Sequence, residues 1–168
     1  MEFFSFLWTN FWGKTIVTFI LSLSPILELR GSIAYGMGAG LEPWFVFIVA
    51  IIGNMIPIPF IILFIRKVFE WIRTHMKWLG GLVERLEAKG NNPKNQEKIK
   101  KYGFWGLLMF VAIPLPGTGA WTAALVAAML GMRLKNAVPA ICLGVVSAGI
   151  IVTVAYSGIL GAVGELLK

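Results

Sequence analysis

Glu28 and Arg30 are the residues of this sequence whose types and spacing could do chemistry. They stand between two uncharged, mainly apolar stretches, residues 15–27 and 31–41. At the centre of a membrane helix each charge costs roughly 2.5–3.5 kcal/mol, a cost that normally persists for function or for a tight structural pair. Glu28 is a natural proton carrier, and the planar guanidinium of Arg30 suits phosphate or carboxylate. The pair therefore predicts a substrate and proton site, with an ion pair that fixes only the local fold as the alternative.

The backbone around this pair is predicted to be broken. Pro25 removes a helical hydrogen bond, and Gly31 permits a tight bend. We expect an extended stretch after Pro25, on which Glu28 and Arg30 share one side because side chains alternate along a strand. Residues 14–41 then form either one broken span or a re-entrant hairpin, since neither uncharged stretch crosses a ~30 Å core alone. A helix that restarts after this break would point its N-terminus at an anion.

A second break is predicted in the uncharged stretch 104–132, at Pro114-Leu115-Pro116-Gly117-Thr118-Gly119. Two prolines and two glycines in six residues cannot continue a helix. We expect a loop at mid-membrane, with Thr118 as the N-cap of a helix that restarts near Trp121. The loop lacks the lysine and the preceding strand of a Walker phosphate loop. Its candidate site residues are Pro116, Gly117, Thr118, Gly119 and Trp121, with Pro114 as a structural break.

The composition is that of a membrane protein. Hydrophobic residues make up 58% of the 168-residue chain, and charged residues make up 14%. Uncharged stretches cover 44–65, 104–132 and 136–164, and each is long enough for a transmembrane helix. A soluble chain of this length has too little polar surface to bury three such segments. The sequence therefore predicts an all-α integral protein of the cell membrane that crosses the bilayer several times.

The stretch 44–65 is predicted to be an irregular span. It contains Asn54, Pro57 and Pro59, and the two prolines are structural breaks because each removes a helical hydrogen bond. Asn54 either lines the substrate site or, as polar residues in membrane helices commonly do, bonds to a neighbouring helix.

Positive charge is concentrated in one segment. The net charge is +7, and ten of the fifteen Lys and Arg residues lie within 66–101. Loops rich in Lys and Arg stay in the cytoplasm, so this charge indicates topology and not a nucleic-acid surface. We expect a single membrane domain, 1–168, with an aromatic interfacial helix at 1–13, a first repeat at 14–65, a basic cytoplasmic interfacial segment at 66–103, which begins with a surface helix at 66–86, and a second repeat at 104–164.

The two halves are predicted to be related. A shift of 91 residues lays Pro25 on Pro116, Gly40 on Gly131 and Gly53 on Gly144. Each half is a broken segment followed by a span. If one hairpin enters from outside and the other from the cytoplasm, the halves have inverted topology. Paired interrupted segments of this kind indicate a transporter site at the midplane, between the two re-entrant loops.

The two broken motifs resemble the paired signatures of the small multidrug export protein family. The matching segments are Ser24–Ile33 and Ala112–Thr122. That family is similar to the wider DedA-type membrane proteins. The resemblance implies a bacterial or archaeal plasma-membrane protein with two facing re-entrant hairpins. The DedA-type relatives imply a cargo with a polyprenyl-phosphate or phospholipid headgroup.

The function expected from these observations is that of a transporter or lipid translocator, coupled to an ion such as the proton, for a small anionic or amphiphilic substrate. A cationic multidrug exporter and a membrane scaffold without transport are the alternatives. An enzyme is not expected, because one Glu and one Arg do not form a nucleophile–base set. No cluster has metal-ligand spacing, no cofactor is expected, and Cys142 forms no disulfide framework. The expected partners are membrane lipids, an anionic lipid or small molecule, and a second copy in a homodimer.

The charge distribution predicts that Lys89 and Asn136 both face the cytoplasm. Cys142→Ala removes the native thiol, and single cysteines at the two positions are then labelled in intact cells with a membrane-impermeant reagent. We expect no labelling until the cells are opened. Strong labelling of the cysteine at position 89 from outside would overturn this topology.

Overall fold

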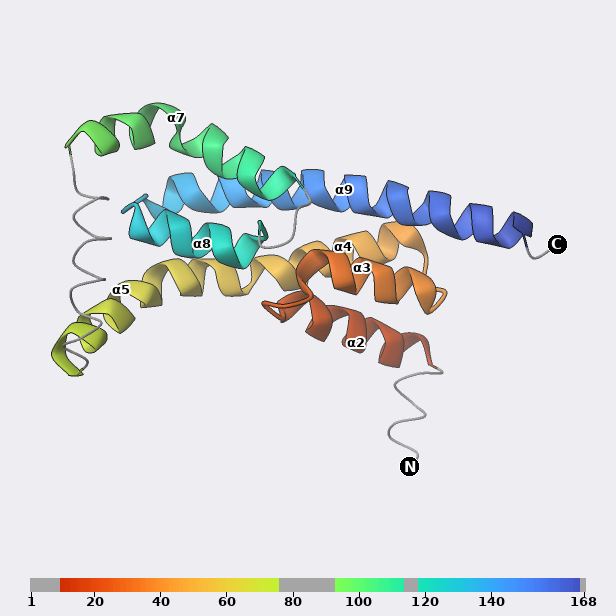
Figure 1. Ribbon diagram of the computed structural model, residues 1–168. Coiled ribbons are helices and arrows are strands. Elements are labelled where there is room, and N and C mark those ends of the chain that lie inside the picture. The colour runs from red at the N-terminus through yellow and green to blue at the C-terminus, as the bar shows by residue number, and fades with distance from the viewer. Residues whose placement is uncertain (1–9, 76–92, 114–117, 167–168) are drawn as a thin grey trace. The chain divides into compact units, whose positions relative to one another are not determined.

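The computed structural model describes residues 10–75, 93–113 and 118–166, and these residues form α-helices and no strand. This confirms the all-α prediction. The predictions for Pro114, Pro116 and Gly117, for residues 1–9 of the N-terminal segment and for residues 76–92 of the basic interfacial segment lie outside the described residues. The helices are α2 (Phe11–Leu23), α3 (Glu28–Gly38), α4 (Pro43–Met55), α5 (Pro57–His75), α7 (Pro93–Ala112), α8 (Ala120–Met129) and α9 (Leu134–Leu166) (Figure 1).

Two stretches in the described residues are long and apolar enough to cross a membrane. They are Pro43–Ile65, which takes in α4 and the start of α5, and Leu134–Ala162 in α9. Protein covers 28% of the most apolar window of the first and 44% of that of the second. The core helix of a soluble protein would be mostly covered, whereas a membrane helix keeps an apolar face toward lipid. By length and composition, the two stretches are therefore candidate membrane spans.

The junction between α4 and α5 lies at Ile56, which directly precedes Pro57. Proline is tolerated in the first turn of a helix because its missing N–H would have no partner there, and this also accommodates Pro59. Helix α5 then continues without interruption to His75. A separate surface helix that begins at Arg66, as expected from the sequence, is not found. No Gly or Pro separates Ile65 from Arg66, so nothing ends the helix there.

The chain divides into two compact units, residues 1–56 with 145–168, and residues 57–144. In the first unit α2 and α3 form an antiparallel hairpin, because the Nζ of Lys14 donates a 2.7 Å hydrogen bond to the carbonyl of Ala39. Residues 14–41 are thus a hairpin and not one broken span. Its arms of 13 and 11 residues extend about 20 and 16 Å, each less than a ~30 Å hydrocarbon core.

The core of the first unit joins α3 to α4. Leu29, Ile33 and Met37 lie on one face of α3 at helical spacing, and all three are buried, as are Val46 and Ala50 of α4. A side chain at Gly36 would overlap Val46 and meet the Thr18 hydroxyl at 3.1 Å. Helix α4 therefore crosses the hairpin at close range, and this packing fixes the relative heights of all three helices.

The second unit is built from α5, α7, α8 and the first part of α9. Helix α5 packs against α8. Small residues on a helix face let backbones approach closely, which is how helices associate in lipid. The buried face of α8 consists of alanines, and Ile58 and Ile62 of α5 are buried in the same unit. The alanines are Ala120, Ala123, Ala124, Ala127 and Ala128.

The same turn occurs twice, 91 residues apart. After α3, the N–H groups of Ala39, Gly40 and Leu41 bond to Tyr35, Met37 and Gly36, and after α8 those of Leu130, Gly131 and Met132 bond to Val126, Ala128 and Ala127. Gly40 and Gly131 both have positive φ, 81° and 66°, which a residue without Cβ adopts at little cost. The helices that follow the two turns begin at Pro43 and Leu134, again 91 residues apart.

A glycine in each long helix touches the helix before the break. A Cβ on Gly53 would overlap Ser22 Oγ and lie 3.0 Å from the carbonyl oxygen of Phe19. A Cβ on Gly144 would lie 2.6 Å from the Cβ of Val111 and 2.9 Å from the carbonyl oxygen of Leu108. The two contacts have the same form, a glycine against a carbonyl and the side chain three residues on. The turns and the glycine contacts therefore match in two stretches of the chain, α2 to α5 and α7 to α9, which we call the first and the second helical set.

Gly53→Ala and Gly144→Ala should each destabilise the protein by about 1–3 kcal/mol, because the new methyl group meets a backbone carbonyl that cannot move aside. Gly106→Ala is the matched control, since a Cβ at Gly106 meets nothing within 4 Å. Thermal unfolding in detergent measures all three. If Gly53→Ala is as stable as Gly106→Ala, the close approach of α2 and α4 is not real.

Candidate functional site

The first break consists of four residues between α2 and α3. The hydroxyl oxygen of Ser24 accepts a hydrogen bond from the N–H of Ile26 (3.3 Å), and the Ser24 carbonyl accepts one from Glu28 (3.0 Å). Pro25, Ile26 and Leu27 are exposed. The backbone polar groups of the turn are thus partly satisfied by its own serine, while its apolar side chains face outward. This is the arrangement that a loop surrounded by lipid or protein requires.

Glu28 begins α3 with a φ of +48°, a left-handed conformation that is uncommon for a residue with a long side chain. The extended stretch expected after Pro25 is not found, because α3 begins at Glu28 and the N–H of Gly31 already bonds to Leu27. Gly31 lies inside this helix, where a side chain would overlap Leu27 Cβ, and does not form the bend. Backbone strain of this kind costs about 1–3 kcal/mol and gathers at functional sites.

Glu28 and Arg30 attract each other electrostatically across the first turn of α3. Both side chains are partly exposed. The N-terminal dipole of α3 favours a carboxylate and disfavours a guanidinium, so Arg30 stands where helix electrostatics oppose it. The carboxylate and the guanidinium together can exchange a proton and hold an anion. This is the chemistry expected from the sequence, but the expectation that an extended stretch puts both side chains on one side is not met, because positions two apart on a helix do not face each other.

The second break joins α7 to α8. The hydroxyl of Thr118 donates a 2.9 Å hydrogen bond to the carbonyl of Ile113, one of the carbonyls left open where α7 ends. The expectation that Thr118 caps the next helix is wrong, since Gly119 is the N-cap of α8 and no side chain caps it. Trp121 lies in the first turn of α8. The offset of 91 places it at the position of Arg30, and Gly119 at that of Glu28.

Asn54 is 1% exposed, and its Oδ1 accepts no hydrogen bond from any residue that the structure describes. One of the two alternatives for Asn54 was a hydrogen bond to a neighbouring helix. The described part of the chain shows no such bond to Asn54 Oδ1. A buried acceptor without a partner costs about 1–3 kcal/mol. Asn54 directly follows Gly53, the residue that touches Ser22.

Three further polar side chains in the first unit were not anticipated from the sequence. Thr18, Ser22 and Ser32 are each 0% exposed. Each hydroxyl donates to a carbonyl of its own helix, those of Lys14, Phe19 and Leu29. The available signal was the spacing of Thr18 and Ser22, which puts both on one face of an otherwise apolar helix.

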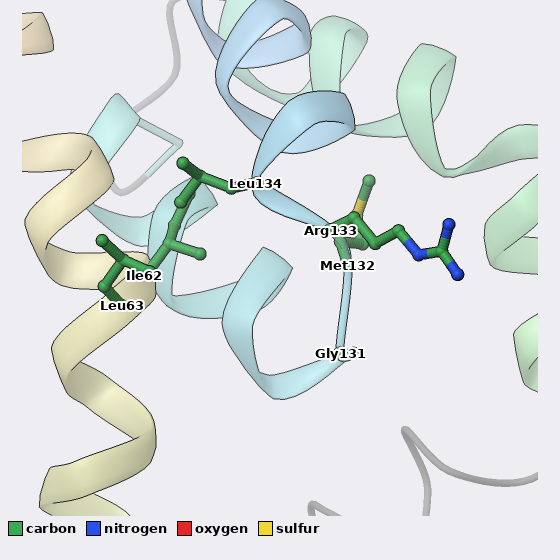
Figure 2. A pocket seen from close by; sticks show the side chains of 6 residues that line it. All are labelled: Ile62, Leu63, Gly131, Met132, Arg133 and Leu134. Carbon is green, nitrogen blue, oxygen red and sulfur yellow. The ribbon is translucent and has the colours of Figure 1, made fainter.

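Two cavities lie at the turns of the helical sets and not at the breaks. One of about 430 Å³ in the second unit is lined by Ile62 and Leu63 of α5 and by the turn Gly131–Leu134 (Figure 2). The other, of about 380 Å³, is lined by Lys14, Ala34, Tyr35, Gly38 and Ala39. Glu28, Arg30 and Asn54 line neither of them. In Figure 2 the guanidinium of Arg133 points away from Ile62 and Leu134, and Arg133 is exposed.

No group of three or more His, Cys, Asp and Glu side chains that could hold a metal ion occurs among the described residues. The free Cys142 is partly buried on α9.

A double-mutant cycle of Glu28→Gln and Arg30→Gln tests whether the electrostatic interaction between these two residues is structural. Because both groups are partly exposed, we expect a coupling below about 1 kcal/mol in thermal unfolding. Lys101→Gln, which changes an exposed charge, is the control for the loss of one charge. A coupling of several kcal/mol would instead mean that the pair is kept to hold the hairpin together.

Comparison with known proteins identifies the family of this chain. No curated protein and no solved structure matches the chain. A family model described as "Putative small multi-drug export protein" matches residues 28–151, which run from the start of α3 to the middle of α9 and leave out α2. The match covers well over half of the sequence, and the chain belongs to this family.

Proposed function

We propose that this chain is an ion-coupled membrane transporter or lipid translocator for a small anionic or amphiphilic substrate. The first break is its substrate and proton site, and the second break is the counterpart in the other helical set. The observation that carries the proposal is that Glu28 and Arg30 start a short helix at a break in a hairpin whose other charged residue is Lys14. The family description, an export protein, supports the general class.

The two helical sets are proposed to insert in opposite directions. Their matching turns differ in charge, since Glu42 precedes α4 where Arg133 precedes α9, with Lys135 close by. Basic residues keep a turn in the cytoplasm, whereas acidic ones have little influence. In the second unit Ile62 and Leu63 lie beside the turn of Arg133, and the basic residues Arg66 and Lys67 follow within the next turn. Basic residues of α5 and of the turn at Arg133 thus lie at the same end of this unit, as an inverted pair of hairpins requires.

Each residue of the pair has a role in this proposal. Arg30 keeps its charge in a protein and offers a planar fork of donors, which suits a phosphate or carboxylate. The N-terminus of α3 adds open N–H groups and a favourable dipole. Glu28 takes up and releases the proton. The strained backbone of Glu28 makes a change of its conformation during the cycle inexpensive, because the strain is relieved when the residue leaves it.

A cationic drug exporter is the second candidate, and the family description favours it. A cation would bind to Glu28 and would be repelled by Arg30. The permanent charge of Arg30 therefore favours an anion. A scaffold that transports nothing is the third candidate.

The substitutions Arg30→Lys and Glu28→Gln in proteoliposomes test the proposal. Arg30→Lys should weaken binding of a fluorescent anionic phospholipid about tenfold or more, because it loses the bidentate fork. Glu28→Gln should preserve this binding and abolish flux driven by a pH gradient. Arg133→Lys, an exposed charge at a turn, is the matched control.

Other outcomes decide among the alternatives. Loss of ethidium binding in Glu28→Gln, with Arg30→Lys unaffected, would contradict the anion and support a cationic exporter. Absence of flux for both probes in the wild type would support a scaffold.

A further inference from the structure

The two helical sets differ in the polarity of their cores. The four buried polar residues in the described part of the chain, Thr18, Ser22, Ser32 and Asn54, all belong to the first unit. The offset of 91 pairs Ser32 and Asn54 with Ala123 and Val145. In the matched glycine contacts Ser22 corresponds to Val111, an offset of 89, and the same offset of 89 pairs Thr18 with Leu107. All four partners are buried and apolar. The second set therefore serves as an internal comparison, in which the same positions pack without polar groups.

Three of these side chains lie at one height in the first unit. Thr18 of α2 meets Gly36 of α3, and the two helices are antiparallel. One turn farther toward the break, Ser22 on α2 is therefore level with Ser32 on α3. Gly53 of α4 touches Ser22, which brings Asn54 to the same level. The layer formed by Ser22, Ser32 and Asn54 lies about one turn from the break.

The layer contains oxygen atoms that can still accept a hydrogen bond or bind a cation. The hydroxyls of Ser22 and Ser32 donate their protons to the carbonyls of Phe19 and Leu29, at 2.7 and 2.9 Å, so each hydroxyl oxygen has lone pairs left and no proton to give. Asn54 Oδ1 has no donor among the described residues. A buried acceptor of this kind is stabilised by a ligand that brings positive charge or a donor.

We propose that this layer binds a monovalent cation of the Na⁺ class, with Asn54 Oδ1, Ser22 Oγ and Ser32 Oγ as ligands. Hard cations prefer oxygen ligands, and in transporters backbone carbonyls beside broken helices commonly coordinate Na⁺. The layer itself contains no carboxylate, and a divalent ion buried among neutral oxygens would keep most of its charge uncompensated. An anion is excluded from the layer because the oxygens would repel it.

The proposed cation site rests on these observations alone. The further inference that the bound cation is the coupling ion of the transporter rests on the proposed function. In that role the cation would be held one turn from Glu28 and Arg30, in the same hairpin. The experiment therefore measures cation binding through stability and needs no substrate or flux. If no transport is measured, the cation site can still be confirmed by the stability experiment. If Na⁺ does not bind, the proposed transport function is not contradicted.

Thermal unfolding of the purified protein in detergent, with NaCl replaced by choline chloride or KCl at constant ionic strength, tests the site. A cation that binds the folded state raises the melting temperature with its concentration. We expect Na⁺ to do so for the wild type and for Thr15→Val, which removes a hydroxyl of α2 outside the layer. Asn54→Val copies the residue of the second set and should lose this dependence. In choline alone Asn54→Val should melt above the wild type, since it removes an unsatisfied acceptor.

Ser32→Ala, which copies Ala123, is the second variant in case Asn54→Val does not fold, and it should shift the Na⁺ midpoint to higher concentration. Two results would overturn the proposal. One is a wild-type melting temperature that Na⁺ does not raise above its value in choline chloride. The other is an equal Na⁺ dependence in the wild type and in both layer variants.

Discussion

The structure depends on one constraint, which is that backbone polar groups inside a bilayer must find partners within the protein. Helices meet it along their length, and so each place where a helix stops needs its own solution. At the first break the serine side chain and carbonyl of Ser24 take up neighbouring N–H groups. At the second, Thr118 bonds back to the end of α7. At both turns a left-handed glycine closes the helix before it. The breaks are therefore built features, and the charged pair occupies one of them.

The division between polar and apolar cores follows from the same constraint. In lipid there is little hydrophobic force between helices, so small residues and close packing hold them together. The second set meets this with an alanine face on α8. The first set replaces part of that packing with hydroxyls bonded to their own helices and with Asn54. The corresponding residues of the second set are buried and apolar, so packing alone does not account for polar residues at these positions of the first set, and we look to function for the reason.

Much of the fold could be predicted from the sequence, because prolines and charges act locally. Pro25 correctly located the first break, and the lengths of the uncharged stretches predicted short helices on either side. The offset of 91, which rests on few identities, is matched by hydrogen bonds that a shared backbone turn produces whatever its side chains are. The errors have one cause. Three local features depend on which neighbouring carbonyls have no hydrogen-bond donor yet. They are the start of α3 at Glu28, the place of Gly31 within α3 and the hydrogen bond of Thr118. Likewise the burial of Ser22 and Ser32 depends on which face of a short apolar helix meets its partners, and uniform hydrophobicity hides that face.

The helical stretch after each matching turn, α4 with α5 in the first set and α9 in the second, starts in one compact unit and ends in the other. Residues 43–56 belong to the first unit and 57–75 to the second, while 134–144 belong to the second and 145–166 to the first. A polypeptide with a single set would therefore leave a hairpin without the helical arm that completes its core. Two such chains could complete each other by exchanging arms, as in a domain-swapped dimer. Joining both sets in one chain makes that exchange intramolecular, so that folding no longer depends on protein concentration and each set is free to diverge in sequence from the other.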